Sequence, residues 1–255
     1  MKKAKEVYDK YYQDLKTPIG GAERYLWINT GLLGAATDKT ILDVGCGEGS
    51  LLKMLKEKGN NVFGIDASKE GLLAAQEKKI DCKLLDVSTE KFPYDDNKFD
   101  IVLCLETIEH VENPHHCIWE IKRVLKEKGM FIISIPNFKM LHPYIYPGLF
   151  KFKHFRNFLE LNSFEIVQVK GWGQVTMLNR TDRWLKSKNN VFTRYLSKFI
   201  FYLSRKRNAL MRNHLGTPLT YSHAWNFICI NNKTDKSLLE LVADETCHSK
   251  TGQAN

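Results

Sequence analysis

The amino-acid sequence predicts an α/β protein with a Rossmann-like, doubly wound and mostly parallel sheet. We also expect an N-terminal helical cap and a basic helical insert before the last strand. Two observations lead to this prediction. Continuous apolar runs alternate with amphipathic helical patterns, and three glycines directly follow the best strand candidate. Strands of a parallel sheet read as continuous apolar runs because helices cover both of its faces.

The elements follow one another in a regular order up to residue 137. Residues 1–35 look helical, with a break at TPIGG, and form the expected cap. Helices are recognised by apolar residues at helical spacing, and strands by short apolar runs. The expected strands are TILDVG (40–45), NVFGID (61–66), DCKLLDV (81–87), KFDIVLCLE (98–106) and MFIISIPN (130–137). The expected helices are SLLKMLKEKG (50–59), SKEGLLAAQEKK (68–79) and NPHHCIWEIKRVLKEKG (113–129).

The rhythm changes after Pro136. The segment FRNFLELNSFEIVQVKGWG (155–173) reads as a helix followed by a strand, and HAWNFICINN (223–232) is a late strand. A basic stretch separates these two segments, and the end of the chain is polar. The predicted units are a helical cap over 1–35, a core over 36–178, a basic helical insert over 179–218, the last core strand over 219–232 and a polar tail over 233–255.

The composition excludes several classes of protein. The hydrophobic fraction of 43% over 255 residues is enough for a globular core, and no apolar run reaches the ~18 residues of a membrane-spanning helix. The N-terminus is charged and lacks the apolar stretch of a secretory signal. The six cysteines form no C-x-x-C pair and several lie in apolar runs, which is typical of thiols in a reducing compartment. We therefore expect a cytoplasmic protein.

The segment ILDVGCGEGS, residues 41–50, points to a binding site. Ligands of an open α/β sheet bind beyond the carboxyl ends of its strands, where glycine lets the backbone approach them closely. Asp66 ends the second strand and can accept hydrogen bonds from both ribose hydroxyls of a nucleoside. Asp86, after the third strand, could accept one from an adenine amino group. The alternative is a tight strand–helix turn with Asp66 as a helix cap.

Three stretches of the chain resemble the class I S-adenosylmethionine-dependent methyltransferases. They are ILDVGCGEGSLLKMLKEKGNNVFGIDAS, KLLDVSTEKFPYDDNKFDIVLCLETIEHVENP and EIKRVLKEKGMFIISIPN, within about residues 38–172. The resemblance implies an enzyme with the cofactor S-adenosyl-L-methionine. The glycines would make room for its methionine part, with Asp43 near the amino group, Asp66 at the ribose and Asp86 at the adenine. The implied cofactor-binding residues are Asp43, Gly45, Cys46, Gly47, Gly49, Asp66, Ala67, Asp86, Val87 and Leu105.

Two acids and a histidine follow the fourth strand at the same edge, namely Glu106, Glu109 and His110. Three roles are open for these candidate catalytic residues. His110 could act as a general base, because the pKa of histidine lies near neutrality. The three side chains could hold a divalent ion such as Mg²⁺. Glu109 and His110 could also simply order the loop and the cofactor pocket.

The E-x-x-E-H string resembles two metal-using branches of the superfamily. They are the ubiquinone-biosynthesis O-methyltransferases and the small-RNA 3′-terminal 2′-O-methyltransferases, in which the ion polarises the substrate hydroxyl. In such chains a histidine stands four residues before the phenylalanine that matches Phe150, and this chain has Tyr146 there. His142 is the nearest substitute, and His154 is expected to face along a helix.

Residues 180–212 carry ten lysines or arginines and one acid, so this stretch accounts for the whole net charge of +9. Within it, VFTRYLSKFIFYLSRKR (191–207) places an apolar stripe on one helical face. Three roles are open, namely a cap helix packed on the sheet, an interfacial helix on an anionic membrane and an RNA-binding arm. The last ranks lowest, because the sequence shows no RNA-binding module. We therefore expect no nucleic-acid partner.

The leading functional hypothesis is methyl transfer from S-adenosyl-L-methionine to an oxygen of a small-molecule, lipid-linked or glycan-linked acceptor. Nitrogen and carbon acceptors are also open. The protein would then be cytoplasmic, with peripheral contact to the inner membrane face through residues 180–212. The alternatives are an RNA 2′-O-methyltransferase and a non-catalytic S-adenosylmethionine-binding module that recruits partners.

Overall fold

The computed structural model describes residues 25, 27–34, 36–137, 145–172, 222 and 224–233. Strands and helices alternate through most of this range, as the sequence predicts. The strands are β1 (Thr40–Val44), β2 (Asn61–Asp66), β3 (Asp81–Leu84), β4 (Phe99–Leu105), β5 (Leu125–Pro136), β6 (Phe164–Trp172) and β7 (Ala224–Asn231). The helices are α3 (Ser50–Glu57), α4 (Lys69–Glu77), α5 (Pro114–Val124) and α6 (Phe152–Leu161), with a short π-helix η1 (Ile28–Leu32) and a 3-10 helix η2 (Ile108–His110).

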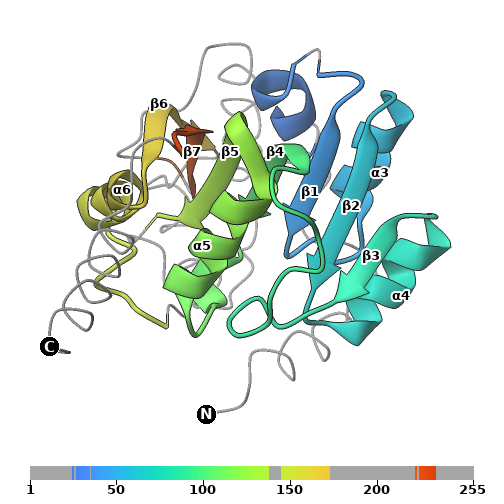
Figure 1. Ribbon diagram of the computed structural model, residues 1–255, viewed down its shortest axis with the longest axis horizontal. Helices are drawn as coiled ribbons and strands as arrows, with labels where there is room; N and C mark the ends of the chain where they lie inside the picture. The colour runs from blue at the N-terminus through green and yellow to red at the C-terminus, as the bar shows by residue number, and fades with distance from the viewer. Residues whose placement is uncertain are drawn as a thin grey trace, which may run out of the picture.

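The described strands form one seven-stranded sheet in the order β3-β2-β1-β4-β5-β7-β6 (Figure 1). β1 to β5 are parallel to one another, and β7 lies antiparallel between β5 and β6. The strand order reverses at β1, so the sheet is doubly wound and mostly parallel, as predicted. The arrowheads of β1, β2 and β3 point to the same edge in Figure 1. This carboxyl edge is where sheets of this type bind their ligands.

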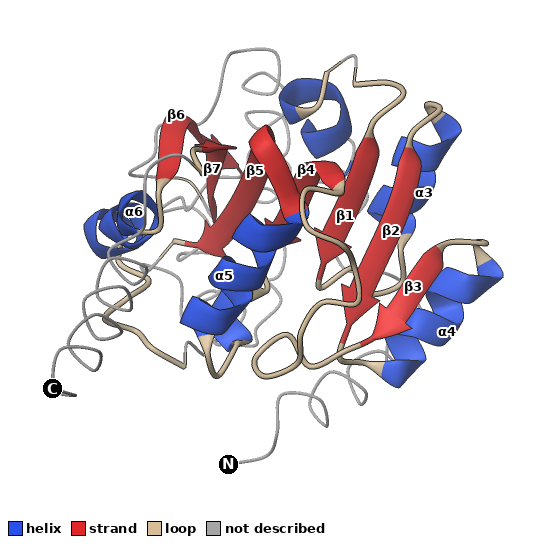
Figure 2. Cartoon of the chain, viewed as in Figure 1, coloured by secondary structure: helices blue, strands red, loops and turns tan. Residues whose placement is uncertain are grey.

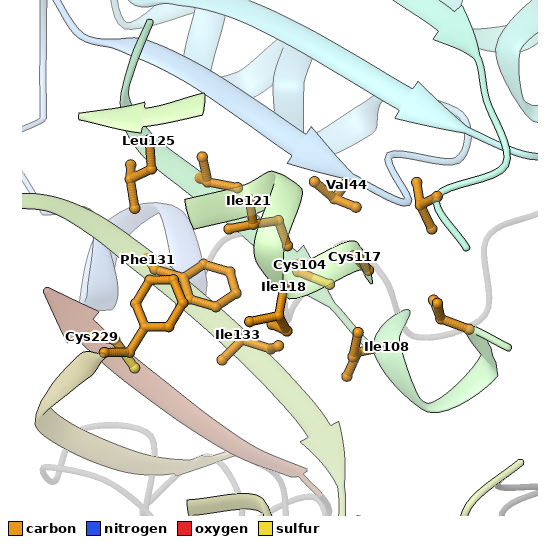
Figure 3. Close-up of a cluster of buried hydrophobic side chains, with 14 of the residues drawn as sticks. Val44, Cys104, Ile108, Cys117, Ile118, Ile121, Leu125, Phe131, Ile133 and Cys229 are labelled. Carbon is orange, nitrogen blue, oxygen red and sulfur yellow. The ribbon is translucent and has the colours of Figure 1, made fainter. Parts of the chain in front are cut away.

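Helices cover both faces of the sheet (Figure 2). Successive residues of a strand point to opposite faces, so β1 contributes to two separate hydrophobic cores. Ile41 packs with buried leucines of α3 such as Leu52, whereas Leu42 packs with the core that contains Ile121 of α5. Figure 3 shows part of this second core, where Ile121 lies near Val44. The two cores hold the sheet rigid, and the carboxyl edge is therefore a fixed platform for side chains.

Side-chain caps explain where two of these helices begin. The hydroxyl of Ser68 accepts a hydrogen bond from the Gly71 N–H at 3.1 Å and caps α4. The amide oxygen of Asn113 accepts one from the His116 N–H at 3.1 Å, and Pro114 occupies the first helical position of α5. Both caps satisfy N–H groups that have no partner within the helix. The start of α5 at Asn113-Pro114 is the one that the sequence predicts.

The end of α5 differs from the prediction, which was wrong for the segment LKEKG (125–129). The helix ends at Val124, and β5 begins at Leu125, which pairs with Phe99 of β4. The register then shifts, so that the next pair is Met130 with Ile101. Leu125 is fully buried. Burial of Leu125 against β4 thus overrides the helical preference of the lysines and glutamate that follow it.

Several predicted segments lie outside the described residues. They are most of the N-terminal cap, residues 138–144 with His142, the basic insert and the polar tail. The described part of the cap is helical, as expected, and Ile28 of η1 packs in the same core as α3. Within the described ranges, no helix has the length and apolar character needed to cross a bilayer. The predicted boundaries of the insert and the tail stay predictions.

Candidate active site

A pocket opens at the carboxyl edge of the sheet, next to the loops that follow β1, β2, β3 and β4. Most of the residues that line it come from the segments that the sequence analysis singled out. The lining residues are Tyr25, Gly45, Cys46, Asp66, Ala67, Asp86, Val87, Ser88, Leu105, Glu106, Thr107, His110 and Val111. Seven of the ten predicted cofactor residues therefore meet Glu106 and His110 of the E-x-x-E-H segment in one cavity.

Gly45 shows why the loop after β1 needs glycine. Its φ of +80° lies in the left-handed region, which side chains other than glycine rarely adopt. A Cβ atom at this position would occupy the space of the Thr107 side chain, which comes from the loop after β4. The Gly45 N–H also donates to the carbonyl oxygen of Ile65 at 2.8 Å. The glycine loop, residues 45–49, is thus held between β2 and the segment that contains His110.

The other side of the glycine loop rests on α4. A Cβ atom at Gly49 would lie 3.1 Å from the Cβ of Ala75, and Gly49 also has a left-handed φ of +71°. The Lys78 ammonium donates to the carbonyl oxygen of Glu48 at 2.7 Å and to its carboxylate at 2.9 Å. Because the loop is fixed at both sides, its backbone has one defined shape at the pocket.

Asp66 orients the end of β2 toward the pocket. Its Oδ2 accepts a hydrogen bond from the Gly47 N–H at 2.8 Å, and its Oδ1 accepts one from the Ser68 N–H at 2.7 Å. These bonds fix the carboxylate between the glycine loop and the start of α4. The alternative prediction was that Asp66 caps the following helix. In the structure, the side chain that caps α4 is that of Ser68. Asp66 lines the pocket as the cofactor prediction requires.

Asp43 lies behind the loop and does not line the pocket. Its side chain is 4% exposed, and its Oδ1 has no hydrogen-bond partner in the part of the chain that the structure describes. Burial, followed by repulsion from Asp66, raises the pKa of Asp43 from 3.8 to about 7. Ionisation of this carboxyl group is costly. A positive charge in the neighbouring pocket would stabilise its ionised form.

Asp86 and its neighbours form the wall of the pocket beyond β3. The Oδ1 atom of Asp86 accepts a hydrogen bond from the Ser88 N–H at 2.9 Å. The Ser88 hydroxyl in turn accepts one from the Glu112 N–H at 3.1 Å, which ties this wall to the segment after η2. β3 ends at Leu84, so Asp86 lies on the loop, where its side chain can meet a ligand.

Glu106 has an unusual backbone for a residue with a side chain. Its φ is +53°, and its N–H donates to both the carbonyl oxygen and the hydroxyl of Ser134, each at 3.1 Å. Non-glycine residues in this region persist only where the surroundings hold them, often at functional sites. Ser134 of β5 is fully buried and provides that restraint. As a result, Glu106 lines the pocket directly after β4.

The two other members of the E-x-x-E-H segment have different positions. His110 lines the pocket, whereas Glu109 is fully buried and lies beside it, with 3.8 Å between Glu109 Oε1 and His110 Nε2. Glu109 therefore lies beside His110 and does not line the pocket. Tyr146 donates its hydroxyl to the carbonyl oxygen of Glu112 at 2.6 Å, and His154 contacts the Gly148 carbonyl from α6.

A metal site is not formed by the described residues alone. No three His, Cys, Asp or Glu side chains among them are grouped so that they could hold an ion. The predicted trio of Glu106, Glu109 and His110 is divided between the pocket and the core, as described above. His142, the expected further ligand, lies outside the described residues. That Glu106, Glu109 and His110 hold a divalent ion stays a prediction.

Of the predicted cofactor residues, three support the pocket without lining it, namely Asp43, Gly47 and Gly49. Four lining residues were missed by the sequence analysis, namely Tyr25, Ser88, Thr107 and Val111. Ser88, Thr107 and Val111 each directly follow a predicted residue, so a wider window around those residues would have included them. Tyr25 is different, because only the fold brings the N-terminal segment to this edge.

Comparisons with known proteins agree with this geometry. Residues 42–133 match a family model described as a methyltransferase domain. The chain is 36% identical over 149 residues to a ubiquinone biosynthesis O-methyltransferase of Glaesserella parasuis, covering 52% of this chain and 63% of the relative. It is 31% identical over 176 residues to an uncharacterized protein of Methanocaldococcus jannaschii, covering 65% of this chain and 74% of that protein.

Solved structures agree at the level of the fold. A SAM-dependent methyltransferase from Aquifex aeolicus aligns with a TM-score of 0.54 at 17% identity, covering 87% of this chain and 97% of that one. This chain spans less than two thirds of the length of the Glaesserella parasuis relative. The fold, the glycine loop and the matched domain together define its class. The chain belongs to the class I S-adenosylmethionine-dependent methyltransferases.

Proposed function

We propose that this protein transfers the methyl group of S-adenosyl-L-methionine to a hydroxyl oxygen of a small-molecule or lipid-linked acceptor. The observation that carries the proposal is the shared pocket. Asp66 and Asp86, which suit a nucleoside, line the same cavity as His110. A side chain that can accept a proton thus lies in the cavity that would hold the cofactor.

The residues present fit this cofactor. Gly45 keeps the loop after β1 free of side-chain atoms, and Asp66 is already oriented by two backbone N–H groups. The buried Asp43 provides negative charge behind the loop once it is ionised, which suits a cofactor that carries positive charge. When bound, the cofactor supplies a methyl group on a positively charged sulfur, which makes the methyl group reactive toward a nucleophile.

The side chains after β4 would prepare the acceptor. A hydroxyl group is a better nucleophile once its proton has been removed, and His110 is the residue to which we assign that step. Glu109, 3.8 Å from the ring, would stabilise the imidazolium that results. Glu106, which precedes η2, would orient the acceptor. Alignment supplies much of the rate in such a displacement, and the base contributes a smaller share.

Two observations support an oxygen acceptor that is attached to a lipid. The relative from Glaesserella parasuis is named for O-methylation in ubiquinone biosynthesis. In addition, residues 180–212 combine a net charge of +9 with an apolar stripe, which suits an anionic membrane surface. An amine acceptor would have less use for a base such as His110, because an uncharged amine is already nucleophilic.

The test begins with calorimetry of S-adenosylhomocysteine binding to the full chain. A methyl-labelled cofactor is then offered with phenolic acceptors that do or do not carry a prenyl tail, with an amine and with a short RNA. We expect label on a phenolic oxygen and faster transfer to the prenylated acceptor. Transfer only to the amine, or only to the RNA 2′-hydroxyl, would contradict the proposed acceptor. No binding of S-adenosylhomocysteine would contradict the cofactor site itself.

A further inference from the structure

Two cysteines face each other where the glycine loop meets β3. Cys46 belongs to the glycine loop and lines the pocket, and Cys82 lies in β3. The Cys46 thiol donates to the Cys82 sulfur, with 3.7 Å between the two Sγ atoms. Oxidation of the two thiols to a disulfide would shorten this separation to about 2.05 Å.

Gly64 of β2 makes this contact between the thiols feasible. A Cβ atom at Gly64 would lie 2.6 Å from the Cys46 sulfur and 2.7 Å from the Cys82 sulfur, which no real side chain could tolerate. Gly64 is the register partner of Cys82 in the sheet. A glycine inside a strand costs roughly 0.5–1 kcal/mol of stability relative to alanine. Here it leaves the space in which the two sulfur atoms meet.

The position of this pair sets it apart from the other described cysteines. Cys104, Cys117 and Cys229 are fully buried in the hydrophobic core, where Figure 3 shows them among Ile118, Ile133 and other apolar side chains. Cys104 and Cys117 also share a hydrogen bond, so proximity alone does not distinguish the two pairs. Accessibility distinguishes the two pairs, because Cys46 borders the pocket and Cys82 is only partly buried.

We propose that Cys46 and Cys82 form a modification site at which a small peroxide converts the two thiols into a disulfide. The Cys82 thiolate attacks one oxygen of hydrogen peroxide, and the O–O bond breaks. Cys82 becomes a sulfenic acid, and the leaving hydroxide becomes water by taking up the proton that Cys82 released on ionisation. The Cys46 sulfur then attacks the sulfenic sulfur, the S–O bond breaks, and the leaving hydroxide takes the Cys46 proton as water. Overall, two thiols lose two electrons to one peroxide and two waters form.

The order of these steps follows from the surroundings of each thiol. Cys82 is the more accessible sulfur, so it meets the peroxide first. The pKa of the Cys46 thiol lies well above its usual value, because of its hydrogen bond with Cys82 and then because of burial. Cys46 is therefore a poor first nucleophile and serves as the resolving thiol, which needs only to reach a sulfur that is already next to it.

The disulfide would change the shape of the glycine loop. The sulfur atoms must approach by about 1.6 Å, and β3 is held by its ladder with β2, so the loop takes up most of the movement. Cys46 lies between Gly45 and Gly47, and the Gly47 N–H holds Asp66 in place. Oxidation would thus move the loop and release Asp66. For this effect on cofactor binding, the inference rests on the proposed function.

The experiment exposes the full chain to hydrogen peroxide, with and without saturating S-adenosylhomocysteine, and maps the cysteines by mass spectrometry. We expect a cross-linked pair of peptides containing Cys46 and Cys82, two hydrogen atoms lighter than the thiol forms. S-adenosylhomocysteine should slow its formation, because the ligand fixes the loop. Its affinity for the oxidised protein should fall at least about tenfold and return after reduction with dithiothreitol.

Two variants give the test its controls. Cys82→Ala should bind S-adenosylhomocysteine as the wild type does and lose the response to peroxide. Cys104→Ala, in the buried pair, should keep the response. The inference is overturned if no disulfide between Cys46 and Cys82 forms, or if the Cys82→Ala variant still responds to peroxide. A disulfide in a protein whose reduced form does not bind S-adenosylhomocysteine would instead contradict the proposed function, since the mass readout needs no cofactor.

Discussion

At the scale of single residues, the carboxylates around the pocket have separate tasks. Asp66 lines the cavity and is fixed by two N–H groups, whereas Asp43 is buried behind the loop and does not line the cavity. Glu106 and His110 line the other wall. Because each of these side chains acts through a different contact, single substitutions should separate cofactor binding, stability and turnover.

Replacing Asp66 tests its contact with the cofactor. Asp66→Ala removes the acceptor of two ribose hydrogen bonds and should weaken binding of S-adenosylhomocysteine by about 2–4 kcal/mol, the usual worth of two charge-assisted bonds. Calorimetry measures the change. Asp95→Ala, at an exposed position in the loop before β4, serves as the control. A loss below about 0.5 kcal/mol, as at an uninvolved surface position, would argue against this role.

Replacing Asp43 tests the effect of its buried carboxyl on stability. The pKa is raised from 3.8 to about 7 in the folded protein, so the folded state binds the proton more tightly than the unfolded state. The contribution of Asp43 to stability is thus fully present below about pH 4 and is lost as pH rises to 7, by up to about 4 kcal/mol. Asp43→Asn should lack this loss.

Urea unfolding without cofactor, at several pH values between 4 and 8, measures this difference. The free energy of unfolding of Asp43→Asn, relative to wild type, should rise with pH over that range. A constant difference between the two proteins at every pH would show that Asp43 has no raised pKa. The same variant should bind S-adenosyl-L-methionine more weakly at pH 8, because it lacks the negative charge behind the loop.

His110→Ala tests the proposed base. The variant should keep its affinity for S-adenosylhomocysteine within a few fold, and its turnover should fall by about 10²–10⁴, the range typical of a lost general base. His154→Ala, an exposed position of α6, is the matched control. Full turnover in His110→Ala would exclude both the base and the metal roles of this residue.

Chelation separates these two roles. If His110 acts as a base without a metal ion, turnover should be unchanged in EDTA. The pH–rate profile should then show a limb near the pKa of a histidine. Loss of turnover in EDTA, with recovery in Mg²⁺, would instead establish the metal site that the resemblance suggests.

At the scale of elements, the end of α5 shows how distant residues decide local structure. The side-chain amide of Asn231, from β7, donates to the carbonyl oxygens of Lys122, Leu125 and Lys126, each at 3.2 Å. Lys122 belongs to the last turn of α5, whose carbonyls have no partner within the helix, and Leu125 and Lys126 begin β5. A contact with a residue more than a hundred positions away thus stabilises the point at which α5 becomes β5.

Asn231→Ala tests that contact. The substitution leaves buried carbonyl groups unsatisfied and should lower the free energy of unfolding by about 1–3 kcal/mol. Urea unfolding measures it, with Asn157→Ala on the exposed face of α6 as the control. An equal effect of the two substitutions would mean that the amide of Asn231 does not hold this junction.

The same junction marks the limit of prediction from sequence. β2 and β7 were predicted almost to the residue, because an apolar run between polar residues has few other interpretations. The segment LKEKG was assigned to the helix because its lysines and glutamate favour one, and neither Phe99 nor Asn231 is visible in a local window. Prediction of the site has the same limit, because local motifs can be recognised in the sequence and distant contacts cannot. The glycines and acids lie in local motifs, whereas Tyr25 reaches the pocket only through the fold.

At the scale of the whole molecule, charge is concentrated in one part of the chain. Residues 180–212, which lie outside the described ranges, carry a net charge of +9. Each lysine or arginine near an anionic surface contributes about 1 kcal/mol. We expect the protein to co-sediment with vesicles that contain anionic lipid and much less with neutral ones. The binding should weaken as salt shortens the screening length.

A triple variant tests this expectation. Replacing Arg205, Lys206 and Arg207 with glutamine should reduce sedimentation with anionic vesicles and leave the unfolding midpoint unchanged. The control for a general effect of charge is the same replacement at Lys56, Lys69 and Lys79, which lie on or next to α3 and α4. If the wild type ignores anionic vesicles even at low salt, the segment has another role and the acceptor should be sought among soluble compounds.

The contact between Gly45 and Thr107 has a consequence for how this enzyme can be altered. The side chain of Thr107 fills the space that a Cβ at Gly45 would need, so the glycine loop is in direct contact with the segment that contains His110. Anyone who redesigns the acceptor preference can shorten residue 107 and keep the cofactor site, whereas a larger residue there would push against bare backbone.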